Sequence, residues 1–176
     1  MKKLLVVVDF QNDFVDGALG FENAKLLESR IVDKIKEYEK NNDEIIFTLD
    51  THYDNYLETI EGQNLPIKHC IKGSCGHELY GEVKELAKNH LVFEKETFGS
   101  DKLYEHLKAN KYSQIELVGL VSNICVISNA VLAKVAQKET SIVVDASCTD
   151  SNDPSLNDMA LKVMESFHVK VINKNG

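Results

Sequence analysis

The chain has 176 residues, of which 28 are acidic and 20 basic, so its formal net charge is -8. A chain of this length can bury a substantial core without disulfides, and we expect a single domain over residues 1–176. The negative charge offers no source for the phosphate neutralisation that nucleic-acid binding requires, which argues against a nucleic-acid partner.

The apolar runs of the sequence are short. None approaches the roughly 20 residues of a membrane helix, and Asp9 ends the apolar run after Lys3 too early for a signal peptide. We therefore expect a soluble, cytoplasmic protein without a membrane partner. The four cysteines, at positions 70, 75, 125 and 148, form no compact disulfide framework. A cysteine with a special role would then be a chemical group rather than a crosslink.

Short β-branched runs alternate with longer amphipathic segments along the chain. The pattern predicts strands at 3–8, 44–49, 91–94, 114–119, 141–145 and 169–173, and helices at 24–39, 79–89, 101–110, 123–137 and 154–166. Strands that are apolar on both faces need helices above and below them, so we predict an α/β fold with a three-layer, doubly wound, six-stranded parallel sheet. The segment 51–77, rich in Gly, Asn, His and Cys, is predicted to be a functional loop.

Polar side chains follow several of these strands. Asp9, Asp50, Lys95 and Cys125 all fall at or just after a predicted strand end, which is where doubly wound sheets bind their ligands. Cys125 lies in the first turn of a predicted helix, where backbone N–H groups and the helix dipole stabilise a thiolate and a developing oxyanion. The alternative for this position alone is a cysteine that packs the helix against the sheet.

Three separated motifs resemble the isochorismatase-like cysteine hydrolase superfamily, which includes the nicotinamidases. They are the stretches VVVDFQNDF at 6–14, FEKETF at 93–98 and GLVSNICV at 119–126. The resemblance spans nearly the whole chain and implies a Rossmann-like topology and a catalytic triad of Asp9, Lys95 and Cys125. It also implies a cis peptide between Leu120 and Val121, with the N–H groups of Val121 and Cys125 forming an oxyanion hole.

The chemistry of these residue types agrees with the roles that the resemblance implies. Asp9 can take the thiol proton as a general base, and the Lys95 ammonium can offset the negative charge gathered on carboxylate and thiolate. The Cys125 thiolate would then attack an amide carbonyl and form a thioester, which water hydrolyses. Read singly, Asp9 is a strand-end turn residue and Lys95 a solvated charge.

A second group of residues suggests a metal site. Asp50 and His52 end the second predicted strand, and His69 follows in the long loop; two imidazoles and a carboxylate suit a divalent ion such as Zn, Fe or Mn. The resemblance implies that these three residues hold a metal that binds the pyridine nitrogen of the substrate. In the alternative interpretations, the histidines make ordinary hydrogen bonds, or a structural zinc is held by thiolates and imidazoles. The residues for such a zinc would be Cys70, Cys75, His69 and His77.

The sequence also departs from the family pattern. Nicotinamidases carry a tryptophan just before the third metal ligand, and this chain has no tryptophan. Phe14 and Phe98 are the aromatic residues expected to contact the substrate instead. Lys68 beside His69 would oppose a metal unless it points to solvent or the substrate bears a carboxylate. Asp13 is expected to be a hydrogen-bonding residue behind the site or a helix cap, and Cys148 to be structural.

The sequence thus predicts a cysteine hydrolase of small amides, foremost a nicotinamidase that converts nicotinamide to nicotinate and ammonia. A related small-amide or carbamoyl hydrolase and, from another class, a non-catalytic module that binds a small molecule or a partner remain the alternatives. An isochorismatase proper cleaves a vinyl ether and needs no cysteine nucleophile, so Cys125 argues against it. A homo-oligomer is compatible with the acidic surface.

Overall fold

The structure, a computed structural model, describes residues 1–174. Its strands, within these residues, are β1 (Lys3–Val8), β2 (Glu44–Asp50), β3 (Leu91–Lys95), β4 (Gln114–Leu120), β5 (Ser141–Asp150) and β6 (Lys170–Ile172). They form one parallel six-stranded sheet in the order β3-β2-β1-β4-β5-β6. The predicted strand number and parallel sheet are confirmed.

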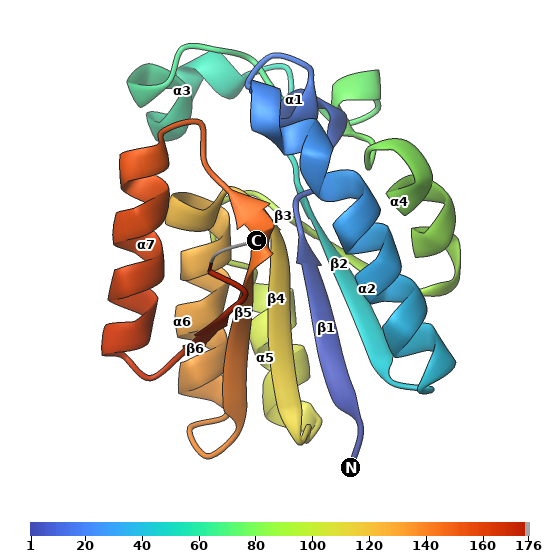
Figure 1. The fold of residues 1–176 in the computed structure, drawn as a ribbon. Helices are drawn as coiled ribbons and strands as arrows, with labels where there is room; N and C mark the ends of the chain where they lie inside the picture. The colour runs from blue at the N-terminus through green and yellow to red at the C-terminus, as the bar shows by residue number, and fades with distance from the viewer. Residues whose placement is uncertain (175–176) are drawn as a thin grey trace.

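Helices cover both faces of the sheet (Figure 1). They are α1 (Asn12–Val15), α2 (Glu28–Lys40), α3 (Ile60–Asn64), α4 (Gly81–Leu86), α5 (Asp101–Ala109), α6 (Ile127–Ala136) and α7 (Pro154–Ser166). Helices α2 and α4 lie on one face, and α5, α6 and α7 lie on the other. This arrangement confirms the predicted three-layer α/β fold.

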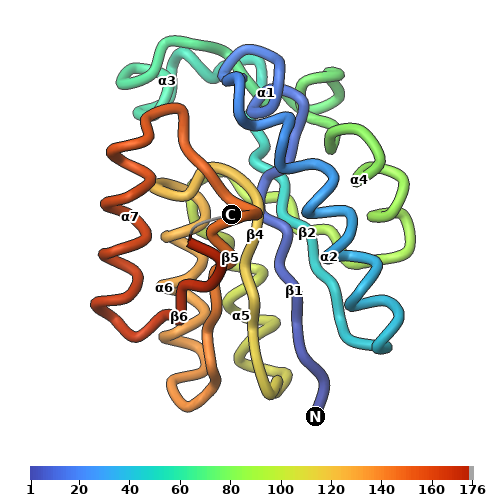
Figure 2. The backbone as a smooth tube through the Cα atoms, in the orientation of Figure 1, coloured from blue at the N-terminus to red at the C-terminus, as the bar shows by residue number. Residues whose placement is uncertain are grey.

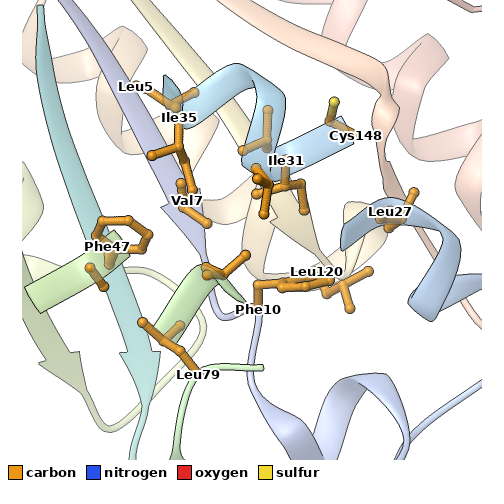
Figure 3. Packing of buried hydrophobic residues seen from close by; sticks show 14 of the residues in the cluster. Leu5, Val7, Phe10, Leu27, Ile31, Ile35, Phe47, Leu79, Leu120 and Cys148 are labelled. Carbon is orange, nitrogen blue, oxygen red and sulfur yellow. The ribbon is translucent and has the colours of Figure 1, made fainter. Parts of the chain in front are cut away.

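The core consists of two apolar layers, one on each face of the sheet. On one side, Ile31 and Ile35 of α2 pack against Leu5, Val7 and Phe47 (Figure 3), and all five are essentially inaccessible to solvent. Neighbouring residues of the same strands point into the other layer, beneath α5, α6 and α7. Each buried side chain of this size contributes about 1.5 to 3 kcal/mol. The strands are therefore apolar on both faces because both faces are covered.

Two short helices and the long loop mark the functional end of the sheet. Figures 1 and 2 show α1 and α3 at the end opposite the N-terminus, where the strands have their carboxyl ends. The segment predicted as a loop at 51–77 folds into short helical turns, including α3. The chain order of the sheet reverses between β1 and β4, and such a switch point is the usual ligand site of a doubly wound sheet.

Gly119 lets β4 approach β1 closely at this switch point. Its φ is +108°, and a Cβ built on it would lie 2.0 Å from the carbonyl oxygen of Val8. A side chain could not be accommodated there without moving the backbone. On the other side of β4, the register with β5 shifts between Leu117 and Gly119, and β5 continues to Asp150, five residues beyond its predicted end. In residues 1–174, no helix combines the length and apolar character needed to cross a bilayer.

Candidate active site and metal centre

Asp9 and Lys95 form a buried ion pair beyond the carboxyl ends of β1 and β3. The Lys95 Nζ lies 2.7 Å from Asp9 Oδ2, and the two side chains are 1% and 0% exposed. The Thr48 hydroxyl donates to Asp9 Oδ1 at 2.6 Å. Asp9 adopts a φ of 45°, a left-handed conformation that aspartate tolerates better than most residues. The carboxylate is thus held by two fixed partners.

Cys125 completes this group from the other side of the switch point. Lys95 Nζ lies 3.6 Å from its Sγ and also donates to the Thr97 carbonyl at 3.0 Å. Cys125 belongs to a π-helical turn, Ser122–Val126, that precedes α6, rather than to a regular first α-turn. The peptide between Leu120 and Val121 is cis, as the resemblance implies. Three distant stretches of chain therefore bring the predicted triad together.

The sulfur is reached through a cavity of about 420 Å³. Cys125 and Val121 both contribute to its lining, together with Asp50 and His69. The same cavity therefore contacts the predicted nucleophile, a residue of the expected oxyanion hole and two of the predicted metal ligands. A small molecule inside it could touch the sulfur and the metal-ligand cluster at once.

Burial and charge act in opposite directions on the triad. Burial raises the pKa of the Cys125 thiol well above its ordinary value, and the nearby Asp9 carboxylate raises it further. Burial also raises the pKa of Asp9, although Lys95 opposes this. Burial lowers the pKa of Lys95, but the charges of Asp9 and Cys125 outweigh it and raise that pKa. These shifts favour the thiol over the thiolate beside a cationic lysine, so formation of the nucleophile needs a base.

The predicted metal ligands also lie together, and a fourth residue joins them. Ligand atoms of Asp50, His52, Glu61 and His69 all lie within 4.8 Å of one another. His52 Nε2 lies 3.0 Å from Asp50 Oδ2 and 3.4 Å from Glu61 Oε1. His69 Nε2 lies 3.4 Å from the same Asp50 oxygen. Sequence analysis missed Glu61, which lies on α3 in the segment expected to be a loop.

The orientation of these ligands is set by local hydrogen bonds. His69 Nδ1 lies 2.8 Å from the Ile67 carbonyl, so it carries the proton and leaves Nε2 free to bind a metal. The His52 backbone is fixed by a parallel bridge to Ile71, and its backbone N–H donates to the Cys70 carbonyl. On α3, the Thr59 side chain accepts from the Gly62 N–H at 3.0 Å and caps the turn that carries Glu61.

Two further residues, Gln11 and Asp13, support the metal-ligand segments. The buried Gln11 side chain donates to the Asp50 carbonyl at 2.9 Å and accepts from the Asp50 N–H at 2.8 Å. Asp13 Oδ2 accepts from the Cys70 N–H at 2.7 Å, and its Oδ1 accepts from the Ala18 N–H at 3.2 Å. Asp13 is therefore a hydrogen-bonding residue behind the site, one of the two roles expected of it.

The ligand group fits a divalent transition metal. Two imidazoles and two carboxylates are ordinary ligands of Zn²⁺ and related ions. The distances between histidine nitrogens and carboxylate oxygens, 3.0 to 3.7 Å, are close to the separation of two ligands that bind one ion at about 2.0 to 2.2 Å in tetrahedral geometry. Burial lowers the pKa of His52, but the Asp50 and Glu61 carboxylates raise it to about 9. Burial raises the pKa of Asp50, but the hydrogen bond from His52 and the Lys95 charge bring it below its ordinary value.

The apolar walls of the cavity include both predicted aromatic residues. Phe14 is buried and lies against His69, with ring centroids 5.6 Å apart, whereas Phe98 is 43% exposed at the rim. Leu65 and Ile124 complete this wall. Lys68 donates to the Asp54 carbonyl at 3.0 Å on the surface, so its charge does not face the cavity.

The cysteines and the remaining histidine of the long loop do not gather into a zinc site. The His77 ring hydrogen-bonds to the Thr51 hydroxyl at 2.8 Å, Cys70 is buried, and Cys75 is exposed beside Asn12. Within residues 1–174, the one cluster with metal-ligand geometry is the group containing Asp50. Cys148 is buried in the core beneath α2 (Figure 3), as a structural cysteine would be.

Comparison with known proteins finds a matching family model and similar proteins of known structure. A sequence model described as the isochorismatase domain matches residues 3–175. An isochorismatase family protein of Bacillus subtilis, PncA, is 32% identical over 143 residues, covering 74% of this chain and 78% of its own length. A crystal structure of nicotinamidase/pyrazinamidase PncA from Bacillus subtilis has a TM-score of 0.85 at 29% identity, covering 97% of this chain and 99% of its own.

More distant structures share the fold. Pyrazinamidase of Pyrococcus horikoshii, solved in complex with zinc, has a TM-score of 0.85 at 22% identity and covers 98% of this chain and 99% of its own. N-carbamoylsarcosine amidase from Thermoplasma acidophilum has a TM-score of 0.80 at 24% identity and covers 100% of this chain and 98% of its own. The same scaffold therefore serves amidases with different substrates.

Proposed function

This chain belongs to the isochorismatase family of hydrolases, and from that membership we propose that it is a nicotinamidase that converts nicotinamide to nicotinate and ammonia through a thioester on Cys125. The observation that carries the proposal is the 3.6 Å contact between Lys95 Nζ and Cys125 Sγ, next to the Asp9 pair, inside a cavity open to a small ligand. A module that only binds a ligand has no need for this buried group.

In the acylation step, Asp9 takes the proton of the Cys125 thiol and the sulfur attacks the carboxamide carbon. The carbonyl π electrons move to oxygen, where the N–H groups of Val121 and Cys125 would stabilise the oxyanion; one such donor is typically worth roughly 3 to 4 kcal/mol. When the oxyanion collapses, the C–N bond breaks and Asp9 returns its proton to the departing ammonia. The product of this half-reaction is a Cys125 thioester.

In the second half-reaction, water replaces ammonia. Asp9 takes a proton from water, and the hydroxide attacks the thioester carbon. The C–S bond then breaks to release the acid, and Asp9 returns its proton to the departing sulfur, which regenerates the thiol and the carboxylate. Throughout the cycle, the Lys95 ammonium balances the negative charge that moves between carboxylate and sulfur. Lys95 is suited to this role because the surrounding charges raise its pKa and keep it protonated.

A metal ion would serve substrate binding rather than proton transfer. A divalent ion held by Asp50, His52, Glu61 and His69 would supply a Lewis-acid contact for the pyridine nitrogen. Phe14 and Leu65 would flank the ring in place of the missing tryptophan, since both line the cavity beside the ligand cluster. We propose Zn, Fe or Mn as the ion. The cytoplasmic location and the homo-oligomeric state stay predictions from the sequence.

The test is release of ammonia from nicotinamide by purified protein, compared with Cys125→Ala. Cys148→Ser is the matched control, because Cys148 is also buried but lies outside the cavity. The proposal predicts release by the wild type and the Cys148 variant and loss of release in Cys125→Ala. Equal ammonia release by all three proteins would refute Cys125 as the nucleophile. Hydrolysis of N-carbamoylsarcosine but not of nicotinamide would refute the proposed substrate.

A further inference from the structure

The two carboxylates that line the catalytic cavity have their basic partners, Lys95 and His52, behind the cavity wall rather than in its lining. Of the side chains lining it, the acidic ones are Asp50 and Glu61, and within residues 1–174 no lysine or arginine contributes to the lining. Glu61 is the more accessible of the two, with 20% of its side chain exposed against 5% for Asp50. An anionic group on a ligand would meet a carboxylate here.

Three lysines of the segments that carry the site residues already have partners. The Lys95 ammonium contacts the Asp9 and Asp50 carboxylates at 2.7 and 3.4 Å and is 1% exposed. Lys68 donates to a backbone carbonyl on the surface, and Lys72 pairs with Glu94 at 2.6 Å. These lysines therefore leave no side chain to pair with a ligand carboxylate.

Glu61 also determines the charge of a loaded metal site. A divalent cation held by two neutral imidazoles and the carboxylates of Asp50 and Glu61 would carry no net charge. With a neutral residue in place of Glu61, the same site would carry one positive charge and attract anions. The second carboxylate thus removes the electrostatic attraction that a site of net charge +1 would offer to an acid.

We infer that Glu61 is a specificity-determining residue that makes the cavity select neutral amides and reject ligands bearing a carboxylate. This inference rests on the proposed amidase function and extends it in two ways. Amides that carry their own carboxylate, such as N-carbamoyl amino acids, are poor substrates. The carboxylate product of amide hydrolysis is expelled by the same charge, so product inhibition is weak.

The first test measures binding without turnover. Zinc-loaded Cys125→Ala protein is titrated calorimetrically with nicotinamide and with nicotinate, and we expect the amide to bind at least about tenfold more tightly. Adding Glu61→Gln should strengthen nicotinate binding by about tenfold and so narrow the difference between the affinities for nicotinamide and nicotinate. Glu58→Gln, an exposed acid of the same segment, is the matched control and should change neither affinity. Nicotinate binding that is as tight as amide binding would overturn the inference.

A second variant covers the case in which Glu61→Gln loses its metal. Asn152 lines the cavity, is exposed and is not one of the metal-ligand residues. Asn152→Lys should therefore strengthen nicotinate binding without altering the zinc content, which is measured on the same sample. An unchanged affinity for nicotinate in the zinc-loaded Lys variant would contradict the inference.

A third measurement separates the inference from the proposed function. Cobalt(II)-loaded protein is titrated with azide and with imidazole and followed by its visible absorption. Wild type should prefer imidazole, and Glu61→Gln should bind azide more tightly than wild type does. If nicotinamide is neither bound nor hydrolysed, the proposed function fails, but this titration still decides the inference. Equal azide affinity in wild type and Glu61→Gln would refute it.

Discussion

The Lys95 ammonium lies 2.7 Å from a carboxylate oxygen of Asp9, and the two side chains are almost completely buried. Burying two charges is costly, and an apolar pair of similar size is often at least as stable. The pair is therefore better explained by chemistry than by stability. The ion pair lies beside Cys125, whose thiol proton Asp9 can accept.

Replacing Asp9 by Asn should remove the proton acceptor while preserving side-chain volume. We expect kcat to fall about 100-fold to 10,000-fold, the usual contribution of a general base. Thr48→Val, which removes only the hydroxyl that donates to Asp9, should reduce kcat far less. Steady-state ammonia release measures both, and a kcat for Asp9→Asn within a factor of two of wild type would exclude Asp9 as the base.

Removing the metal should weaken substrate binding more than it perturbs the fold. The ligand group lies at the carboxyl edge of the sheet and outside both apolar layers. Treatment with a chelator should therefore raise KM for nicotinamide, with only a small shift of the melting temperature, and added Zn²⁺ should restore KM. A large loss of melting temperature on metal removal would instead indicate a structural ion.

Asp13 should act as a positioning residue for the metal site and for the loop over the cavity. Its carboxylate joins the N–H groups of Cys70 and Ala18, and Cβ atoms at Gly17 or Gly76 would lie within 2.4 Å of it. Asp13→Asn should weaken zinc affinity by about 10-fold to 100-fold and raise KM more than it lowers kcat.

The matched control for this prediction is Asp16→Asn, since Asp16 makes only an exposed ion pair with Lys25 in the same segment. A chelator-competition titration gives the zinc affinity of each protein. If both variants bind zinc as tightly as wild type does, Asp13 does not position the site.

Acid should weaken the fold through Asp145, which belongs neither to the cavity lining nor to the metal-ligand group. Lys34 pairs with Asp145 at 2.7 Å and with Glu116 at 2.8 Å. Burial raises the pKa of Asp145, but its hydrogen bond from Lys34 and those from Ser147 outweigh this and leave it below its ordinary value. The folded pKa is lower than the unfolded one, so this stabilisation is present above about pH 4 and is lost as the pH falls through the folded value.

Asp145→Asn should therefore lower the free energy of unfolding at pH 7 by roughly 3 kcal/mol, because it leaves the Lys34 charge short of a partner. The difference between variant and wild type should shrink as the pH is lowered from 6 to 3. Urea unfolding at several pH values measures it. A difference that stays constant with pH would show that Asp145 contributes through packing rather than charge.

The sequence was most informative where a residue's role follows from its place at a strand end. Apolar runs located each strand found in residues 1–174, and the parallel sheet then brought Asp9, Lys95 and Cys125 to one edge, because neighbouring parallel strands end together. The register places Asp50 opposite Lys95, which accounts for their contact. These features depend on periodicity and chain order, both of which a single sequence contains.

Glu61 and Thr48 could not be predicted in the same way. Glu61 reaches the metal ligands only because α3 folds over the site, and its spacing from His52 matches no short metal-binding pattern. Thr48 contacts Asp9 because β2 pairs with β1 in one particular register. Such roles arise from tertiary packing, which propensity and spacing do not determine.

Trapping the acyl-enzyme tests the central claim most directly. Wild-type protein is mixed with nicotinamide, quenched in acid within the first turnovers and digested for mass spectrometry. The proposed mechanism predicts a nicotinoyl group on the peptide that contains Cys125 and no such group on the peptide that contains Cys148. In Cys125→Ser, the nicotinoyl thioester should be absent from position 125. Rapid ammonia release by wild type with no acylated Cys125 at any quench time, and undiminished release by Cys125→Ser, would contradict it.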